Sequence, residues 1–484
     1  MSNAVHRLRR LNLAMARKWN VLGPGLLPFA DADSRELFSL RLLRLSLFQV
    51  TVGMAVVLLI GTLNRVMIVE LGVPAWLVAG MVSLPLVFAP LRAVVGFRSD
   101  THRSVLGWRR VPYLWFGTLL QFGGLAIMPF ALIILSGDTT GPLVVGQVAA
   151  ALAFLLVGAG LHTTQTVGLA LATDITPPRA HPQVVALLCV MLMLGMMVSA
   201  LVFGAVLAQF SEMRLIQVVQ ASAVITIVLN GIALWKQEAR NPALTSPDRA
   251  RPRFADAWRA YDEGSLALRR LIALGLGTAA FSMQDILLEP YGGQVLHLAV
   301  GSTTAFTALL ALGGLCGFGL AAKLLGGGMD PYRLAAAGAM AGVLAFCAVI
   351  FAAPLQSTAA FGTGVAMIGF GAGLFAHSTL TAAMGMAQPG QVGLTLGIWG
   401  AVQASAAGCA VAAGGLIRDG VGALSARGLF GEALNGPATG YATVYCIEIL
   451  LLFATLAAVG PLVRRPSASA SHRGSPMPLA HASR

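Results

Sequence analysis

Twelve long apolar segments constrain this chain more than any other feature of its sequence. Each is roughly 20 residues or longer and carries few charges, which is the length that an α-helix needs to cross a bilayer. Backbone groups in lipid must be hydrogen-bonded within the protein, so we expect these segments to be helices. The expected spans are 45–70, 75–97, 111–136, 143–172, 183–208, 214–235, 267–290, 299–324, 331–353, 357–386, 391–416 and 441–463.

The spans divide into two groups of six, separated by the longest polar connection in the chain. The expected organisation is a basic arm at 1–44, a first half at 45–235, a linker at 236–266, a second half at 267–463 and a disordered tail at 464–484. An even number of spans in each half gives both halves the same orientation in the membrane. The fold class is therefore an all-α membrane protein with two six-helix halves.

The positive charge is distributed unevenly between the two sides of the membrane. Of 32 Lys and Arg residues, three (Arg214, Arg418 and Arg427) fall in one set of loops and Arg65 lies within a span, which leaves 28 on the other side. Positively charged loops stay in the cytoplasm, so both termini and the 236–266 linker are expected there. The net charge of +13 is thus explained by topology, and no nucleic-acid partner is expected.

No reactive constellation is apparent in the sequence. The five cysteines lie in apolar runs without metal-ligand spacing, so we expect neither disulfides nor a metal site (Cys189, Cys316, Cys347, Cys409 and Cys446). There is no nucleotide-binding loop and no nucleophile paired with a base. The chain is not expected to be an enzyme, and we assign no catalytic residue.

Related polar pairs recur at matched depth in the two halves. Asn64 and Arg65 end the first apolar segment, and Gln284 and Asp285 stand at the corresponding place in the seventh. Charges in lipid are expensive and are usually paired or functional. Arg65 and Asp285 are therefore expected either to form a structural pair between the halves or to act as a gate or ligand seat. Glu289 follows Asp285 by four residues in the same span.

The connection between the second and third spans resembles the signature loop of the major facilitator superfamily. The matching residues are Gly96, Asp100, Gly107, Arg109 and Arg110. The loop departs from the signature at Thr101, where a basic residue is usual, and in its longer stretch before Gly107. The carboxylate and the arginine pair can form a latch on the cytoplasmic face. The resemblance implies the major facilitator fold, in which spans one, four, seven and ten line a central cavity.

At finer grain the chain resembles the PucC/LhaA family, the bacteriochlorophyll delivery family of the major facilitator superfamily. The resembling stretches lie in both halves and cover nearly the whole membrane region: 61–70, 97–112, 121–129, 158–166 and 284–292. The extended arm containing Leu27-Pro28-Phe29-Ala30-Asp31-Ala32 resembles the LhaA branch, which serves the core antenna LH1.

This resemblance implies an assembly factor for the bacterial light-harvesting complex. Its expected partners are the LH1 α and β polypeptides, the reaction centre, bacteriochlorophyll or its synthesis enzymes, and membrane lipids. It would reside in the bacterial inner or intracytoplasmic photosynthetic membrane. Bacteriochlorophyll would be a transient cargo, and no other cofactor is expected.

Three residues are candidates for contact with a pigment. His162 and His377 follow a repeated Gly-Ala-Gly-Leu in spans four and ten, and neutral imidazole can ligate the magnesium of a chlorophyll. The alternative for each is an ordinary hydrogen bond to the protein. Glu448 in span twelve is expected at the periphery, where it could face a partner helix or pigment or bond locally to the backbone.

Three other functions stay open on the sequence alone. The chain could be a proton-coupled transporter of a small solute, with Asp285 or Glu289 as the titrating group. It could be an assembly factor of the PucC type, which serves LH2. It could also be a scaffold that binds no pigment.

Overall fold

The computed structural model shows a chain built from helices. No strand occurs among the residues that the structure describes, which are 38–63, 66–67, 75–104, 106–135, 142–207, 211–246, 253–254, 256, 258, 266–298, 300–387, 391–429, 431 and 436–463. The all-α prediction is therefore confirmed for these ranges.

The helices form two sequential groups. The first contains α2 (Phe38–Val56), α4 (Ala75–Phe88), α5 (Arg92–Asp100), α6 (Val111–Leu135), α7 (Leu143–Asp174), α8 (His181–Val206) and α9 (Glu212–Leu234). The short α10 (Pro242–Thr245) follows in the linker. The second contains α12 (Ala267–Ser282), α13 (Leu288–Gln294), α14 (Val300–Gly326), α15 (Pro331–Leu355), α16 (Thr358–Met386), α17 (Val392–Ala426) and α18 (Pro437–Val459).

Ten helices within the described residues are long and apolar enough to cross a membrane. The remaining two expected spans are interrupted. A 3₁₀ turn at Ala89–Leu91, which contains Pro90, separates α4 from α5, and a second 3₁₀ turn at Met283–Ile286 separates α12 from α13. Proline removes a backbone donor and breaks the first of these helices. The protein is a multi-pass membrane protein in which two spans are broken helices.

Some helix ends differ from those expected. Helix α2 begins at Phe38 instead of residue 45, because its first turns are held by the end of α9: Arg41 donates to the carbonyl of Gln237 and Arg44 to that of Trp235. Helix α17 continues to Ala426, ten residues beyond the expected end, so the following connection is shorter.

The first and seventh spans both leave regular α-helix at corresponding depth. Helix α2 passes into a π-helix at Val57–Leu63, directly before Asn64. The 3₁₀ turn in the seventh span contains Gln284 and Asp285. Departures of this kind are common at functional sites.

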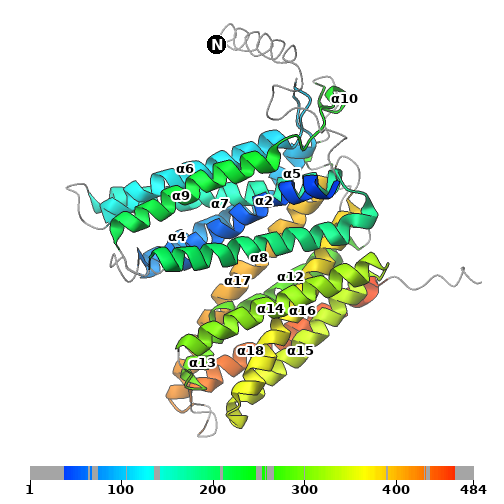
Figure 1. Ribbon diagram of the computed structural model, residues 1–484. Helices are drawn as coiled ribbons and strands as arrows, with labels where there is room; N and C mark the ends of the chain where they lie inside the picture. Colours follow the sequence, from blue (N-terminus) through cyan, green and yellow to red (C-terminus); the bar gives the residue numbers. More distant parts are fainter. Residues whose placement is uncertain are drawn as a thin grey trace, which may run out of the picture.

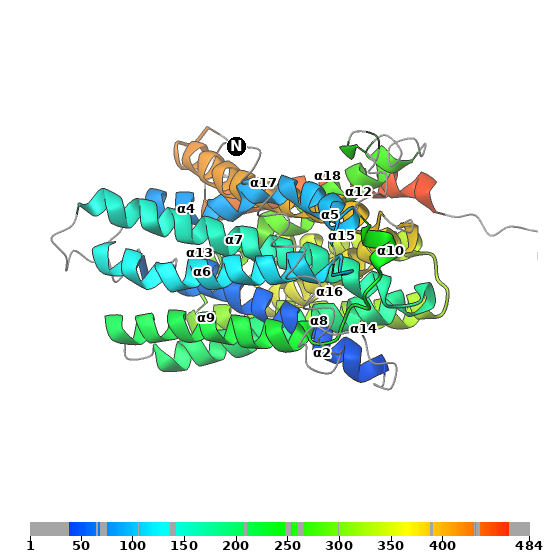
Figure 2. The ribbon, with the colours of Figure 1, turned by 90° about the horizontal axis from the view of Figure 1, so that it is seen from above.

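Figure 1 shows the two groups as separate bundles that diverge at one end and approach at the other. Helix α17 crosses toward the first bundle and lies beside α5 there, and α14 approaches α8. Figure 2, turned by 90°, shows that the helices of the first bundle run nearly parallel to one another. The end at which the bundles approach carries Asp100, Arg110 and Glu238, and we call it the latch end.

Small residues allow the closest helix contacts within each half. A Cβ on Gly160 of α7 would lie 2.6 Å from the carbonyl oxygen of Gly117 on α6. In the second half, a Cβ on Gly371 of α16 would lie 2.7 Å from the carbonyl oxygen of Gly338 on α15. The third and fourth helices of each half thus pack backbone to backbone, which is typical of membrane helices.

Candidate functional site

Asp100 joins the two halves at the latch end. It is the last residue of α5, and its carboxylate accepts hydrogen bonds from the backbone N–H groups of Gly393 (2.9 Å) and Leu394 (2.7 Å). These donors belong to the first turn of α17, whose own N-cap residue, Gln391, makes no side-chain cap. The first N–H groups of a helix lack intrahelical partners, so Asp100 caps α17 from another span.

Arg110 holds this carboxylate in place from the start of the third span. Its Nη2 lies 2.6 Å from Oδ1 of Asp100, and both side chains are almost completely buried. Arg110 also donates to Asp174 (3.0 Å) and Ser99 (2.6 Å). Burial alone would lower the pKa of Arg110, but Asp100 and Asp174 raise it above the usual value. The guanidinium therefore stays charged.

Arg109 and two acidic residues, Asp174 and Glu238, complete the latch. Arg109 pairs with Asp174 at 2.7 Å, closer to the surface. Glu238, just beyond α9, accepts from the backbone N–H groups at the start of α6, those of Arg109, Arg110 and Val111. Burial raises the pKa of Glu238, and these three donors oppose the shift. Sequence reasoning missed both acids, although each stands in a short polar stretch that ends a span.

The two signature glycines have distinct physical roles. A Cβ on Gly96 would lie 1.8 Å from the carbonyl oxygen of Gly393, so only glycine lets α5 approach α17 this closely. Gly107 has a φ of 83°, in the left-handed region that favours glycine. Its carbonyl accepts from the backbone N–H of Asn241 (2.9 Å), which attaches the loop to the linker.

Arg92 is a buried charge that the sequence analysis counted only as part of the basic side. It opens α5, is 1% exposed, and donates through Nε to Oγ1 of Thr166 on α7 (2.9 Å). Its Nη2 is buried and has no hydrogen-bond partner in the described part of the chain. A Cβ on Gly400 of α17 would lie 2.4 Å from its guanidinium carbon, so the side chain is enclosed by both halves.

His162 lies next to Arg92 in the first half and is 8% exposed. Its ring stacks on Phe88 of α4, with centroids 6.5 Å apart and planes inclined by 9°. The ring also bonds to the Pro85 carbonyl, while Nδ1 has no partner among the described residues. The ring thus has the hydrogen bond to the protein that the sequence left open as the alternative to pigment ligation.

His377 forms a contact between the halves. It is fully buried on α16, and its Nε2 lies 2.9 Å from the carbonyl oxygen of Pro182 on α8. The carbonyl can only accept, so Nε2 carries the proton and is engaged. The residue therefore takes the hydrogen-bonded alternative that the sequence left open.

Glu448 is not at the periphery, contrary to the expectation. It is 0% exposed on α18, beside the backbone of Gln284 and near Asp285. The side chain of Gln284 donates to Oδ1 of Asp285 at 2.6 Å. Helix α18 turns this face toward α12, which places Glu448 in the interior of the second half. Three polar residues of the seventh and twelfth spans thus gather at the 3₁₀ turn.

The remaining axis residues lie outside the described residues. Asn64 and Arg65 are not described, and neither is the side chain of Glu289. The proposed pairing of Arg65 with Asp285 therefore stays a prediction. Among the residues that the structure does describe, no group of three or more His, Cys, Asp or Glu could hold a metal ion.

Solved structures share this architecture. The chain superposes on a bacterial homologue of the iron transporter ferroportin with a TM-score of 0.70 and 15% identity, covering 88% of this chain and 99% of the other. It superposes on the major facilitator transporter FucP with a TM-score of 0.60 and 12% identity, covering 87% and 99%. At such low identity the likeness shows the fold alone. The protein is a membrane protein of the major facilitator fold, as predicted.

Sequence comparison identifies the family within this fold. The family model for the PUCC protein matches residues 62–467, and the chain belongs to the PucC family. Protein PucC of Rhodovulum sulfidophilum is 55% identical over 425 residues, which cover 86% of this chain and 92% of that protein.

Two Rhodobacter capsulatus proteins are also similar. One, described as an uncharacterized protein in the puhA-bchM intergenic region, is 53% identical over 459 residues, 94% of each chain. The other, the bacteriochlorophyll synthase 44.5 kDa chain, is 30% identical over 441 residues, covering 89% and 97%.

Proposed function

We propose that this protein is an assembly factor for the core light-harvesting antenna LH1, and that it acts by binding nascent antenna helices, bacteriochlorophyll, or both. The observation that carries the proposal is membership in the PucC family, whose model matches residues 62–467. The name of the 30% identical relative connects that protein with bacteriochlorophyll. The choice of LH1 over LH2 rests on the resemblance of the N-terminal arm to the LhaA branch.

The described residues favour antenna helices over direct ligation of pigment. His162 is covered by Phe88, and the Nε2 of His377 is engaged by Pro182. Glu448 is fully buried. With these side chains in this arrangement, none presents a ligand atom to a space that holds a macrocycle. A pigment carried by the protein would bind through other residues or accompany the antenna polypeptides.

Deletion of the gene in a phototrophic host tests the proposal. We expect the LH1 absorption band to fall while reaction-centre polypeptides are still synthesised, and the wild-type gene to restore the band. Purification in mild detergent should yield LH1 α and β polypeptides with the protein, and the absorption spectrum of the same sample reports any pigment. Normal LH1 content in the deletion strain would contradict the proposal, and a selective loss of LH2 would assign the protein to the other antenna.

A second candidate is proton-coupled transport of a small solute. It is favoured by Glu448, a carboxyl that is buried in the second half beside Asp285, because acidic side chains inside membrane spans often belong to proton pathways. Neither residue forms an ion pair with another residue that the structure describes. Vesicles containing the protein would then accumulate solute when a pH gradient is imposed, and the uptake would be lost in Glu448→Gln. Assembly without such uptake favours the first function.

A further inference from the structure

Two adjoining pockets lie at the latch end, the larger between the halves and the smaller within the second half. The larger has a volume of about 560 Å³, within the range of small-molecule sites. Its lining comes from Pro178, His181 and Pro182 of the first half and from segments of the second half that include Arg270 and Arg333. The smaller is about 30 Å³ and shares Arg270, Tyr332 and Met386 with the larger. Neither belongs to the latch.

The first half contributes the positive end of a helix to the larger pocket. Helix α8 begins there at His181, after the 3₁₀ turn Pro178–Ala180, and no side chain caps its first turn. The N–H of His181 bonds to the carbonyl of Pro178, and Pro182 has no N–H, so the helix dipole is what makes this end attractive to anions. A helix start alone does not make a binding site, but the opposite wall of the pocket adds the charged side chains of the second half.

The second half contributes two arginines and one acidic residue whose carboxylate already accepts backbone hydrogen bonds. Arg270 comes from α12 and Arg333 from the first turn of α15. The acid is Asp330, whose Oδ1 accepts from the backbone N–H groups of Tyr332 (2.9 Å) and Arg333 (3.0 Å). No ion pair joins this carboxylate to Arg270 among the described residues. The pocket therefore keeps an excess of positive charge.

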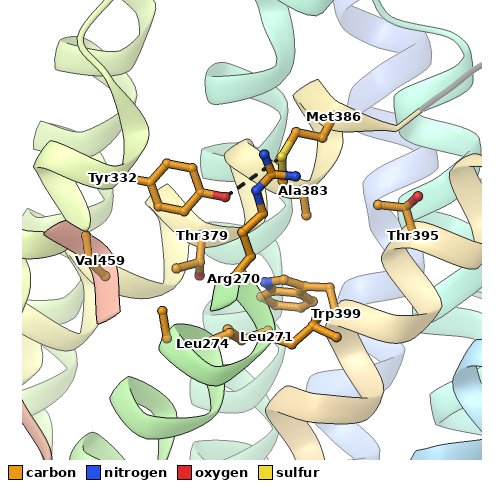
Figure 3. A pocket seen from close by; sticks show the side chains of 11 residues that line it. Arg270, Leu271, Leu274, Tyr332, Thr379, Ala383, Met386, Thr395, Trp399 and Val459 are labelled. Atoms are coloured by element: carbon orange, nitrogen blue, oxygen red, sulfur yellow. Dashed lines mark hydrogen bonds between the residues drawn. The ribbon is translucent and has the colours of Figure 1, made fainter. Parts of the chain in front are cut away.

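Arg270 stands where the two pockets meet. Figure 3 shows its guanidinium between Tyr332 and Met386, above the ring of Trp399. The Tyr332 hydroxyl donates to the Met386 sulfur at 3.8 Å. The Nε of Arg270 is buried and lacks a hydrogen-bond partner within the described ranges. A buried unpaired donor is costly, so this position favours an acceptor from outside the chain.

The smaller pocket supplies an apolar surface beside this charge. Its walls include Leu271, Leu274, Ala383 and Val459, with Trp399 opposite (Figure 3). Its volume is close to that of one water molecule or a methyl group, so it holds no acyl chain and forms an apolar recess beside the charged pocket. The larger pocket also has apolar walls, among them Leu325 and Leu462, and therefore matches an anionic group joined to an apolar part.

We propose that the larger pocket binds the phosphate group of an anionic amphiphile, with the phosphate between Arg270, Arg333 and the start of α8. The observations favour a phospholipid over free phosphate because apolar side chains, among them Leu325, Met386 and Leu462, line this pocket together with the arginines. This site is independent of the proposed function in antenna assembly. Since its walls come from both halves, an occupant also stabilises their contact at the latch end.

Thermal unfolding of the full-length protein in detergent tests the site. The probes are dioleoylphosphatidylglycerol, the zwitterionic dioleoylphosphatidylcholine, and inorganic phosphate. For the wild type we expect phosphatidylglycerol to raise Tm by several degrees more than phosphatidylcholine does. Arg270→Gln and Arg333→Gln should each lose at least half of this difference. Arg98→Gln is the matched control, because Arg98 is exposed on α5 and lines neither pocket.

Several outcomes would overturn the proposal. One is that Arg270→Gln, Arg333→Gln and Arg98→Gln all show the same difference between the Tm shifts with the two lipids. That result would indicate general attraction of anionic lipid to the basic surface. Another is a wild-type response to phosphatidylglycerol no larger than that to phosphatidylcholine. A response to inorganic phosphate alone would overturn the assignment to an amphiphile. If Arg270→Gln does not fold, Arg270→Lys, which keeps the charge, should retain most of the response, and native mass spectrometry of bound phosphatidylglycerol in Arg333→Gln gives a second readout.

Discussion

Asp100 serves two helices at once, because one carboxylate caps α17 and neutralises Arg110. Removing one member of a buried pair leaves the other charge without compensation, at a cost of about 3–5 kcal/mol. We therefore expect Asp100→Ala to reduce the amount of folded protein strongly and, in a phototrophic host, the LH1 content with it. The measurements are membrane protein level and the LH1 absorption band.

Asp174→Ala is the control for this prediction. Asp174 pairs with the same arginine, but its side chain is 20% exposed. Water compensates exposed groups, so the expected loss is about 1 kcal/mol or less. If both substitutions lower the membrane protein level equally, or if Asp100→Ala has wild-type antenna levels, the contact of Asp100 with α17 is not important for stability.

Arg92 leads to a different prediction, because its buried guanidinium contributes little to the free energy of unfolding. The guanidinium has one hydrogen bond, to Thr166, and no ion pair among the described residues. Replacing buried charges by apolar side chains of similar volume is often neutral or stabilising by about 1–4 kcal/mol. We expect Arg92→Met to keep or raise Tm and to reduce LH1 content, since a residue this costly is retained for function.

Arg92→Lys helps to separate charge from geometry in the same assay. Lysine keeps the charge but lacks the planar fork of donors. If LH1 content is normal in Arg92→Met, Arg92 has no role in assembly. If Arg92→Met fails to accumulate in the membrane, the arginine is structural.

The contact between α5 and α17 depends on the absence of side chains at its centre. A Cβ on Gly96 would meet the carbonyl of Gly393, and one on Gly397 would lie 2.4 Å from the carbonyl oxygen of Arg92. Forcing extra volume into a packed interface costs roughly 1–3 kcal/mol. We expect Gly96→Ala to lower Tm by several degrees and to loosen the latch end.

Gly123→Ala is the matched substitution. A Cβ on Gly123 of α6 would meet nothing within 4 Å, and alanine favours a helix more than glycine does. This variant should keep or slightly raise Tm. A similar loss in both variants would mean that the Gly96 effect does not arise from the contact with α17.

At the scale of the whole molecule, the approximate two-fold relation of the halves predicts that Arg65 and Asp285 meet. Each single neutralisation then leaves an unpaired charge at membrane depth, at about 2.5–3.5 kcal/mol. If the pair is structural, exchanging the charges, Arg65→Asp with Asp285→Arg, should restore both protein level and LH1 content. If the pair binds a ligand, the exchange should restore protein level but not LH1 content. Normal behaviour of both single variants would refute any interaction between them.

Topology is the second prediction at this scale. The distribution of Lys and Arg predicts that both termini and the linker lie in the cytoplasm. The start of α2 is tied to Gln237 through Arg41, so these two parts must lie on the same side. Reporter fusions near residue 240 should be cytoplasmic, and those in 427–436 should be external. Fusions reporting one side for both would defeat the assignment.

Membrane-spanning helices, the major facilitator fold and the PucC family could be predicted from the order of the amino acids alone. Backbone groups of an apolar segment of this length must be hydrogen-bonded within the segment in lipid, so helices could be predicted without tertiary information. The latch residues Gly96, Asp100 and Arg110 could be selected because their spacing resembles a known loop. Their partner Gly393 could not, because nothing in a glycine of an apolar helix indicates that its N–H will meet a carboxylate almost 300 residues away.

Which polar side chains are enclosed, and by what, could be seen only once the helices were packed together. Periodicity within one span does not specify which neighbouring helix covers each face, so Glu448 was expected outside and lies inside. For the same reason the sequence did not reveal that Arg92 is buried, because α7 and α17, which enclose it, are distant in the chain. The larger pocket at Arg270 also forms only when the two halves are brought together. Helices are specified by local hydrogen bonding, but charge burial is a property of the whole packed molecule.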